Sequence, residues 1–128
     1  MSSLNLYQNF NLTDPFNILR IICGFFFIPH LVAKFTEQEY ALGFFQKAGF
    51  HPPKVWLYAA FVVEIVVSIG LIFGIYTRYV ALLAAVFLFA ATFGVYRFAG
   101  GKWLWNLGGY EYPLFWGICC IVVAMMAA

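Results

Sequence analysis

The chain has 128 residues, of which 65% are hydrophobic and only 9% are charged, and its formal net charge is +2. A soluble domain usually carries about a quarter charged residues, so this chain has too little polar surface to cover a globule in water. The composition therefore excludes a soluble globular domain, and the small net charge gives no indication of nucleic-acid binding. We predict an all-α integral membrane protein.

Hydrophobic runs at about 15–36, 54–74, 78–98 and 111–128 each have the length of a membrane span. A helix needs about 20 apolar residues to cross a hydrocarbon core of roughly 30 Å. The sequence predicts a polar lead over 1–14 and a single four-helix bundle over 15–128. The first run lacks a basic n-region and a small-residue cleavage site, so we do not expect a removed signal peptide.

The first run begins at Asp14-Pro15, where Asp can cap the first free N–H groups and Pro suits the first helical turn. Pro29 inside it removes one backbone hydrogen bond, so we expect a kink there. The following stretch "TEQEYALGFFQKAGF" is too short and too charged to span. Its aromatic residues share one face, and Gly49 suits a helix C-terminus. We predict an interfacial amphipathic helix between the first two spans.

The second and third runs are separated only by Ile75-Tyr76-Thr77, which predicts antiparallel neighbours. Small residues on one face of a helix allow close helix contact in membranes. Such a face in the third run consists of Ala81, Ala84, Ala85, Leu88 and Thr92, and in the fourth of Gly117, Cys120, Ala124 and Ala128. The third loop is rich in aromatic residues typical of a membrane interface, namely Trp103, Trp105, Tyr110 and Tyr112.

Basic residues are unevenly distributed over the two ends of the predicted bundle. The first and third loops carry Lys34, Lys47, Lys54, Arg97 and Lys102, whereas the other end has Arg20 and Arg78. By the positive-inside rule, these loops lie in the cytoplasm and both termini are periplasmic.

Glu64 lies almost at the centre of the second run, "VWLYAAFVVEIVVSIGLIF". An isolated ionised carboxylate at that depth costs roughly 2.5–3.5 kcal/mol, so it must be protonated, paired or hydrated. In an antiparallel arrangement we expect Glu64 to lie opposite residues near 26 of the first run. The titratable residues of that run fall on one broad helical stripe. We therefore predict a buried polar cluster of Arg20, His30, Lys34 and Glu64, with Arg78, Arg97 and Glu111 nearer the rims.

A structural explanation exists for each of these residues. Arg20 and Lys34 could extend to opposite interfaces, and His30 could be a core histidine beside the Pro29 kink. Glu64 fits either a structural ion pair or a ligand, proton or partner role. Arg78 and Arg97 suit interfacial anchors. No catalytic residue stands out. The three cysteines, Cys23, Cys119 and Cys120, lie inside spans without metal-ligand spacing, so we expect them to be structural.

The ordered motifs resemble the DoxX-like family of small four-helix membrane proteins, from about Leu19 to Gly117. The stretches that carry the resemblance are "LRIICGFFFIPHLVAKF", "FFQKAGF", "VVEIVVSIGLIFGIYTRYVALLAAVFLFAA" and "GGYEYPLFWGI". The positions that match the family pattern are Arg20, Gly24, Lys34, Glu64, Gly70, Gly74, Thr77, Arg78, Gly109 and Glu111.

The resemblance implies a location in the bacterial inner membrane. The family is named for subunits associated with thiosulfate:quinone oxidoreductase, and other members are linked to membrane redox or thiol-stress complexes. We therefore expect a membrane subunit of a quinone-linked redox complex, not catalytic on its own, whose cluster faces a quinone or lipid headgroup. Its partners would be membrane lipid and other membrane or redox subunits. The alternatives are a non-catalytic scaffold of a larger complex, and a proton or small-solute pathway that would need homo-oligomers.

Overall fold

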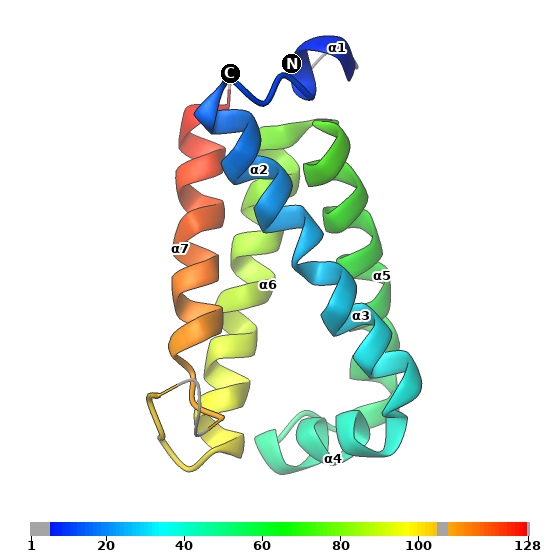
Figure 1. Ribbon diagram of the computed structural model, residues 1–128. Helices are drawn as coiled ribbons and strands as arrows, with labels where there is room; N and C mark the ends of the chain where they lie inside the picture. Colours follow the sequence, from blue (N-terminus) through cyan, green and yellow to red (C-terminus); the bar gives the residue numbers. More distant parts are fainter. Residues whose placement is uncertain (1–5, 105–107, 128) are drawn as a thin grey trace.

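The computed structural model describes residues 6–104 and 108–127, and all regular secondary structure in these residues is helical. This confirms the predicted all-α class. The helices are α1 (Leu6–Asn9), α2 (Pro15–Phe25), α3 (Phe27–Thr36), α4 (Gln38–Ala48), α5 (Pro53–Phe73), α6 (Thr77–Phe98) and α7 (Glu111–Met126). Figure 1 shows the long helices side by side, with both termini at one end of the bundle and α4 across the other end.

Among the described residues, three helices are long and apolar enough to cross a membrane: Pro15–Thr36, which comprises α2 and α3, together with α5 and α6. The prediction of a fourth full-length span over 111–128 is only partly confirmed. Helix α7 is apolar but has 16 residues, which gives about 24 Å of helix, and Ala127 after it is extended. By length and composition, the described residues therefore contain three candidate spans, with α7 packed along α6.

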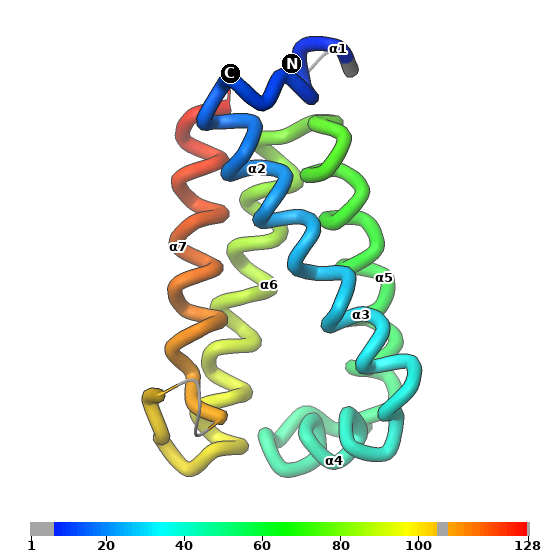
Figure 2. Tube along the Cα trace, in the orientation of Figure 1, coloured from blue at the N-terminus to red at the C-terminus, as the bar shows by residue number. Residues whose placement is uncertain are grey.

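The first span begins as the sequence predicts, because Asp14 Oδ1 accepts a hydrogen bond from Phe16 N–H at 3.0 Å and Pro15 follows the cap. The span is interrupted at Phe26, between α2 and α3. Pro29 explains this position, since it has no N–H to donate to the carbonyl three to four residues earlier. The tube in Figure 2 shows α2 and α3 running obliquely across the bundle, from the terminal end toward α5 and α4.

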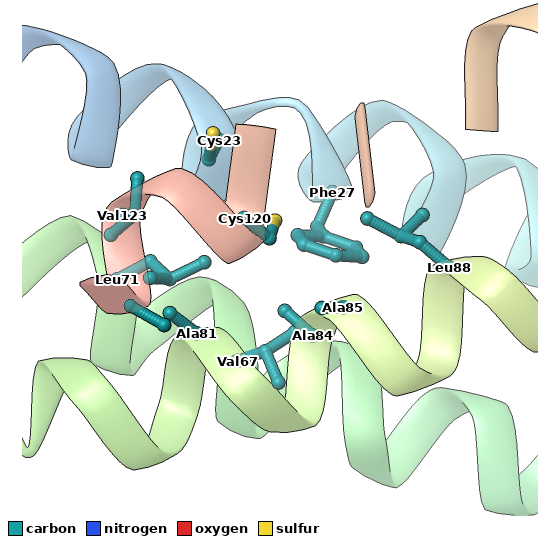
Figure 3. Packing of buried hydrophobic residues seen from close by; sticks show 11 residues of the cluster. Cys23, Phe27, Val67, Leu71, Ala81, Ala84, Ala85, Leu88, Cys120 and Val123 are labelled. Carbon is teal, nitrogen blue, oxygen red and sulfur yellow. The ribbon is translucent and has the colours of Figure 1, made fainter. Parts of the chain in front are cut away.

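The core lies where the small-residue faces of α6 and α7 meet. Helices α6 and α7 make the most extensive contact in the bundle. A Cβ on Gly117 would lie 2.9 Å from the Phe89 ring, so glycine lets α6 and α7 approach closely without displacing that ring. Figure 3 shows the ring of Phe27 pointing into the bundle toward α6. The buried members of the predicted faces are Ala81, Ala84, Ala85, Leu88, Gly117, Cys120 and Ala124, whereas Thr92 is half-buried. Ala128 and Trp105 lie outside the described residues.

Helix α4 is the short amphipathic helix that the sequence predicts between the first two spans. It ends at Ala48 and is capped by Gly49, whose φ of 92° is in the left-handed region that favours glycine. Its apolar face packs on α5 and α6, and the Phe44 ring lies 5.1 Å from the Phe98 ring on α6. Helix α4 therefore covers one end of the bundle.

Candidate ligand-binding site

A cavity of about 610 Å³ lies at the α4 end, between α3, α4, α5, α6 and α7. Its walls are mainly aromatic and small apolar side chains, and the aromatic lining includes Tyr40, Phe44, Phe50, Trp56, Tyr112 and Trp116. The charged and imidazole side chains of the lining are His30, Lys34, Glu37 and Glu64. Three of the four residues of the predicted polar cluster thus line one cavity.

Lys34 and Glu64 form an ion pair in the wall of this cavity, with 2.9 Å between Lys34 Nζ and Glu64 Oε1. Glu64 is 1% exposed, and the Lys34 side chain is 19% exposed. The carboxylate in the middle of α5 therefore has a basic partner on the first span and faces the protein interior. Removal of either partner would be destabilising, because the remaining charge would be buried without a partner of opposite charge.

The register between the first span and α5 explains why Lys34 is the partner. A Cβ on Gly24 would lie 2.7 Å from Leu71 Cβ, so these two positions are directly opposed. Because the helices are antiparallel, Glu64 then lies opposite residues near 31, not near 26. The Lys34 side chain points back toward the N-terminus of its helix and reaches Glu64 from about one turn away.

Arg20 does not belong to this site, and the prediction that it joins the cluster is wrong. The guanidinium donates hydrogen bonds to the carbonyl oxygens of Leu71, Ile72 and Asn9, at 2.9 Å for Ile72. Arg20 is 1% exposed, so it does not extend to an interface either. The shift in register of about five residues moves Arg20 roughly 8 Å further from Glu64 along the helix axis than the sequence predicts. Arg20 instead donates to the last carbonyl groups of α5. A cation at this position is also stabilised by the negative end of the helix dipole.

His30 belongs to an aromatic wall between α3 and α7. Its ring stacks on Tyr112 with centroids 5.7 Å apart and planes at 12°, and lies 5.2 Å from the Trp116 ring. Trp116 Nε1 donates a hydrogen bond to the Cys23 carbonyl at 3.1 Å. Sequence reasoning assigned Tyr112 to an interfacial belt and did not single out Trp116. Their spacing of four residues, which puts both on one helix face, was the available signal.

Comparison with known protein families gives a match over most of the chain. The family model for DoxX matches residues 16–97. This chain belongs to the DoxX family. No curated protein and no solved structure matches it. The matched residues include Lys34 and Glu64, which form the ion pair in this chain. Tyr112 and Trp116 on α7 lie beyond the matched residues.

The remaining predicted site residues of this DoxX family protein lie at helix ends. Arg78 donates a hydrogen bond to the Ala127 carbonyl at 3.0 Å, just after α7. The Arg97 guanidinium lies 5.5 Å from the Phe93 ring centroid, near the end of α6. Glu111 is the first residue of α7. None of the three is a lining residue of the cavity.

The cysteines are apart from the cavity lining. Cys23 and Cys120 are buried in the core and Cys119 is half-buried, all as free thiols. Within residues 6–104 and 108–127, no three His, Cys, Asp or Glu side chains gather closely enough to hold a metal ion. The polar groups of the described cavity therefore include the Lys34 ammonium, the Glu64 and Glu37 carboxyl groups, the His30 ring and the hydroxyl groups of Tyr40 and Tyr112.

Proposed function

We propose that this DoxX family protein is a bacterial inner-membrane subunit that binds a quinone in the α4-end cavity and works with a partner redox protein. The observation that carries the proposal is the buried Lys34–Glu64 ion pair in the wall of an aromatic cavity of about 610 Å³. Small-molecule sites are typically about 300–1,000 Å³, mostly apolar, with a few well-placed polar groups. A quinone combines a flat apolar ring with carbonyl acceptors, which suits this lining.

The ion pair supplies the polar contact for the ligand head. An ammonium group has three N–H donors, so Lys34 can keep its contact with Glu64 and also donate to a quinone carbonyl. The ring would lie among the aromatic side chains of the wall, including Tyr112 and Trp116. Reduction of a quinone takes up two electrons and two protons. In this proposal the electrons come from the partner redox protein. The two protons come from water, and the Lys34 ammonium passes a proton to the quinone oxygen that it contacts and is then reprotonated.

The distribution of basic residues supports an orientation with the cavity toward the cytoplasm. The end of the bundle that holds α4 carries Lys34, Lys47, Lys54, Arg97 and Lys102. The terminal end carries Arg20 and Arg78. With the positive-inside rule, both termini would be periplasmic.

Purification in mild detergent, followed by identification of bound lipids and proteins, tests the proposal directly. We expect an isoprenoid quinone and a redox protein to accompany the chain. Titration with a short-chain benzoquinone should also quench the fluorescence of Trp56 and Trp116 in a saturable manner, since both line the cavity. Lys34→Met removes a charged donor worth about 1.5–3 kcal/mol, so quinone affinity should fall roughly 10- to 150-fold.

Lys54→Met is the matched control, because Lys54 is exposed at the same end but is not a lining residue. Its quinone affinity should equal that of the native protein. A native protein that shows no saturable quinone binding would overturn the proposal. A stoichiometric partner without any quinone would instead favour the scaffold alternative, and proton flux through liposomes that depends on Glu64 would favour a pathway.

A further inference from the structure

Large aromatic side chains pack the side of the cavity that lies next to α4. A Cβ on Gly94 of α6 would lie 3.2 Å from the Phe44 ring and 3.3 Å from the Phe50 ring, so both rings lie directly against α6. The Phe50 ring also lies 5.3 Å from the Trp56 ring on α5. These rings therefore connect α4, α5 and α6 on this side of the cavity.

The side between α3 and α7 is packed differently. Figure 1 shows α3 diverging from α7 toward α5 and α4, and among the described residues α3 makes no extensive contact with α7. The His30 ring bridges the two helices, since it stacks on Tyr112 at 5.7 Å and lies 5.2 Å from the Trp116 ring. All three residues line the cavity. Side chains, and not closely packed helix backbones, therefore bound the cavity on this side.

This side of the cavity faces the acyl chains of the membrane. Tyr112 is 40% exposed and Phe115, next to it on the surface of α7, is 68% exposed. Ala33 on α3 is exposed and also lines the cavity. His30 lies about 9 Å before the end of α3 at Thr36. An apolar surface at this depth of a membrane span is in contact with lipid.

We infer that the ligand enters the cavity sideways from the bilayer, through a portal between α3 and α7 that the His30–Tyr112 stack closes. This inference rests on the proposed function and adds the class of ligand and its route. The ligand is a quinone dissolved in the membrane, whose apolar tail stays among acyl chains while its ring lies in the cavity.

The portal leads directly to the ion pair. Lys34 lies one turn after His30 on the same face of α3, so a ring that passes between His30 and Tyr112 reaches the Lys34 ammonium. The stack is also easy to open. An aromatic pair contributes little energy beyond the burial of its area, so its closure should slow ligand entry only about 2- to 10-fold.

A series of quinones with one ring and different tails tests the route in the native protein. The probes are butyl-, hexyl- and decylbenzoquinone, each equilibrated at the same mole fraction in liposomes that contain the protein. Relaxation of tryptophan fluorescence after a temperature jump gives the association rate constants, with Trp56 and Trp116 as reporters in the cavity wall.

Entry from the bilayer depends on the concentration of quinone in the membrane, so we expect the three quinones to associate at the same rate. Entry from water depends on the free aqueous concentration, which at constant mole fraction falls about fourfold for each added methylene group. A decrease of this size along the series would overturn the inference. The measurement uses the native protein, so it does not depend on the folding of any variant.

Tyr112→Ala tests the position of the portal. Removal of the ring opens the stack, so the association rate of decylbenzoquinone should rise about 2- to 10-fold. A ring that belongs only to the wall of the site would change the dissociation rate and leave association as it is. An unchanged association rate in this variant therefore means that the ligand enters elsewhere, and the inference is wrong.

Tyr58→Ala is the matched control. Tyr58 stacks on Phe61 of the same helix, α5, with centroids 6.4 Å apart and planes at 28°, and neither residue lines the cavity. Loss of this second stack should leave both rate constants at their native values.

The outcomes separate this inference from the proposed function. If the quinones bind in a saturable manner but associate more slowly as the tail lengthens, the route is wrong while quinone binding stands. If none of the three quinones gives saturable quenching, the proposed function itself fails.

Discussion

Gly24 on α2 and Leu71 on α5 are in direct contact, so close that a Cβ on Gly24 would lie 2.7 Å from Leu71 Cβ and 3.1 Å from the Ile72 amide nitrogen. The second atom belongs to the backbone and cannot move aside as a flexible side chain would. Gly24→Ala should therefore push α2 away from α5 and destabilise the bundle by about 1–3 kcal/mol. Thermal unfolding in mild detergent, followed by circular dichroism, measures this loss.

Gly43→Ala on α4 is the control, because a Cβ there meets nothing within 4 Å. Alanine is the better helix former, so this variant should be as stable as the native protein or slightly more stable. A Gly24→Ala protein that unfolds at the native temperature would show that the two helices are not held at this distance.

Arg20 should matter for stability but not for the ligand. It donates to several carbonyl groups around the end of α5 and is buried. Lysine keeps the charge but lacks the planar fork that reaches these oxygens together. Arg20→Lys should cost about 2 kcal/mol of unfolding free energy and leave quinone affinity unchanged. A large fall in quinone affinity in the folded variant would place Arg20 in the site after all.

Local features of the chain could be predicted from sequence, because they depend on neighbouring residues. Asp14-Pro15 starts the first span, Gly49 caps α4, and the burial of an acid in an apolar run predicts that Glu64 finds a basic partner. The choice of that partner depends on the register of two helices, which the contact between Gly24 and Leu71 sets. Helical periodicity within one segment contains no information about this register.

The inward face of α7 could be predicted from its small residues, since Gly117, Cys120 and Ala124 are buried as expected. Hydrophobicity did not indicate that Tyr112 and Trp116 line the cavity, because the run is apolar on all sides. Packing decides which side chains of α7 line the cavity. The Trp116 ring lies 4.3 Å from the Phe27 ring, and Trp116 Nε1–H donates a hydrogen bond to the Cys23 carbonyl. This contact turns Tyr112 toward His30 and completes the cavity wall.

The ion pair should show strong coupling between its two members. Lys34→Met leaves a buried carboxylate without its cation, and Glu64→Gln leaves a mostly buried ammonium without its anion. Each single variant should lose about 3 kcal/mol of unfolding free energy. The double variant removes both charges, so its loss should be smaller than the sum of the two single losses by about 2 kcal/mol. Detergent titration of the native protein, the two single variants and the double variant gives the unfolding free energies from which the coupling is calculated.

Strictly additive losses would contradict this prediction, since they would mean that Lys34 and Glu64 do not interact. Lys47→Met combined with Glu64→Gln is the comparison cycle. Lys47 is exposed and its ammonium lies over the Phe98 ring at 5.1 Å, outside the cavity lining. This second pair should give additive losses.

Filling the cavity should abolish binding while the polar pair stays in place. Ala91 on α6 is half-buried and lines the cavity, so the ring in Ala91→Phe would occupy space that the ligand needs. Because the added ring enters an existing cavity, the unfolding free energy should change by less than about 1 kcal/mol. Quinone affinity, measured by tryptophan quenching, should fall at least tenfold.

Val86→Phe is the control on the same helix, since Val86 is 67% exposed on the outer surface. Native affinity in Ala91→Phe would mean that the quinone binds elsewhere, because a ring at that position and a ligand in this cavity exclude each other.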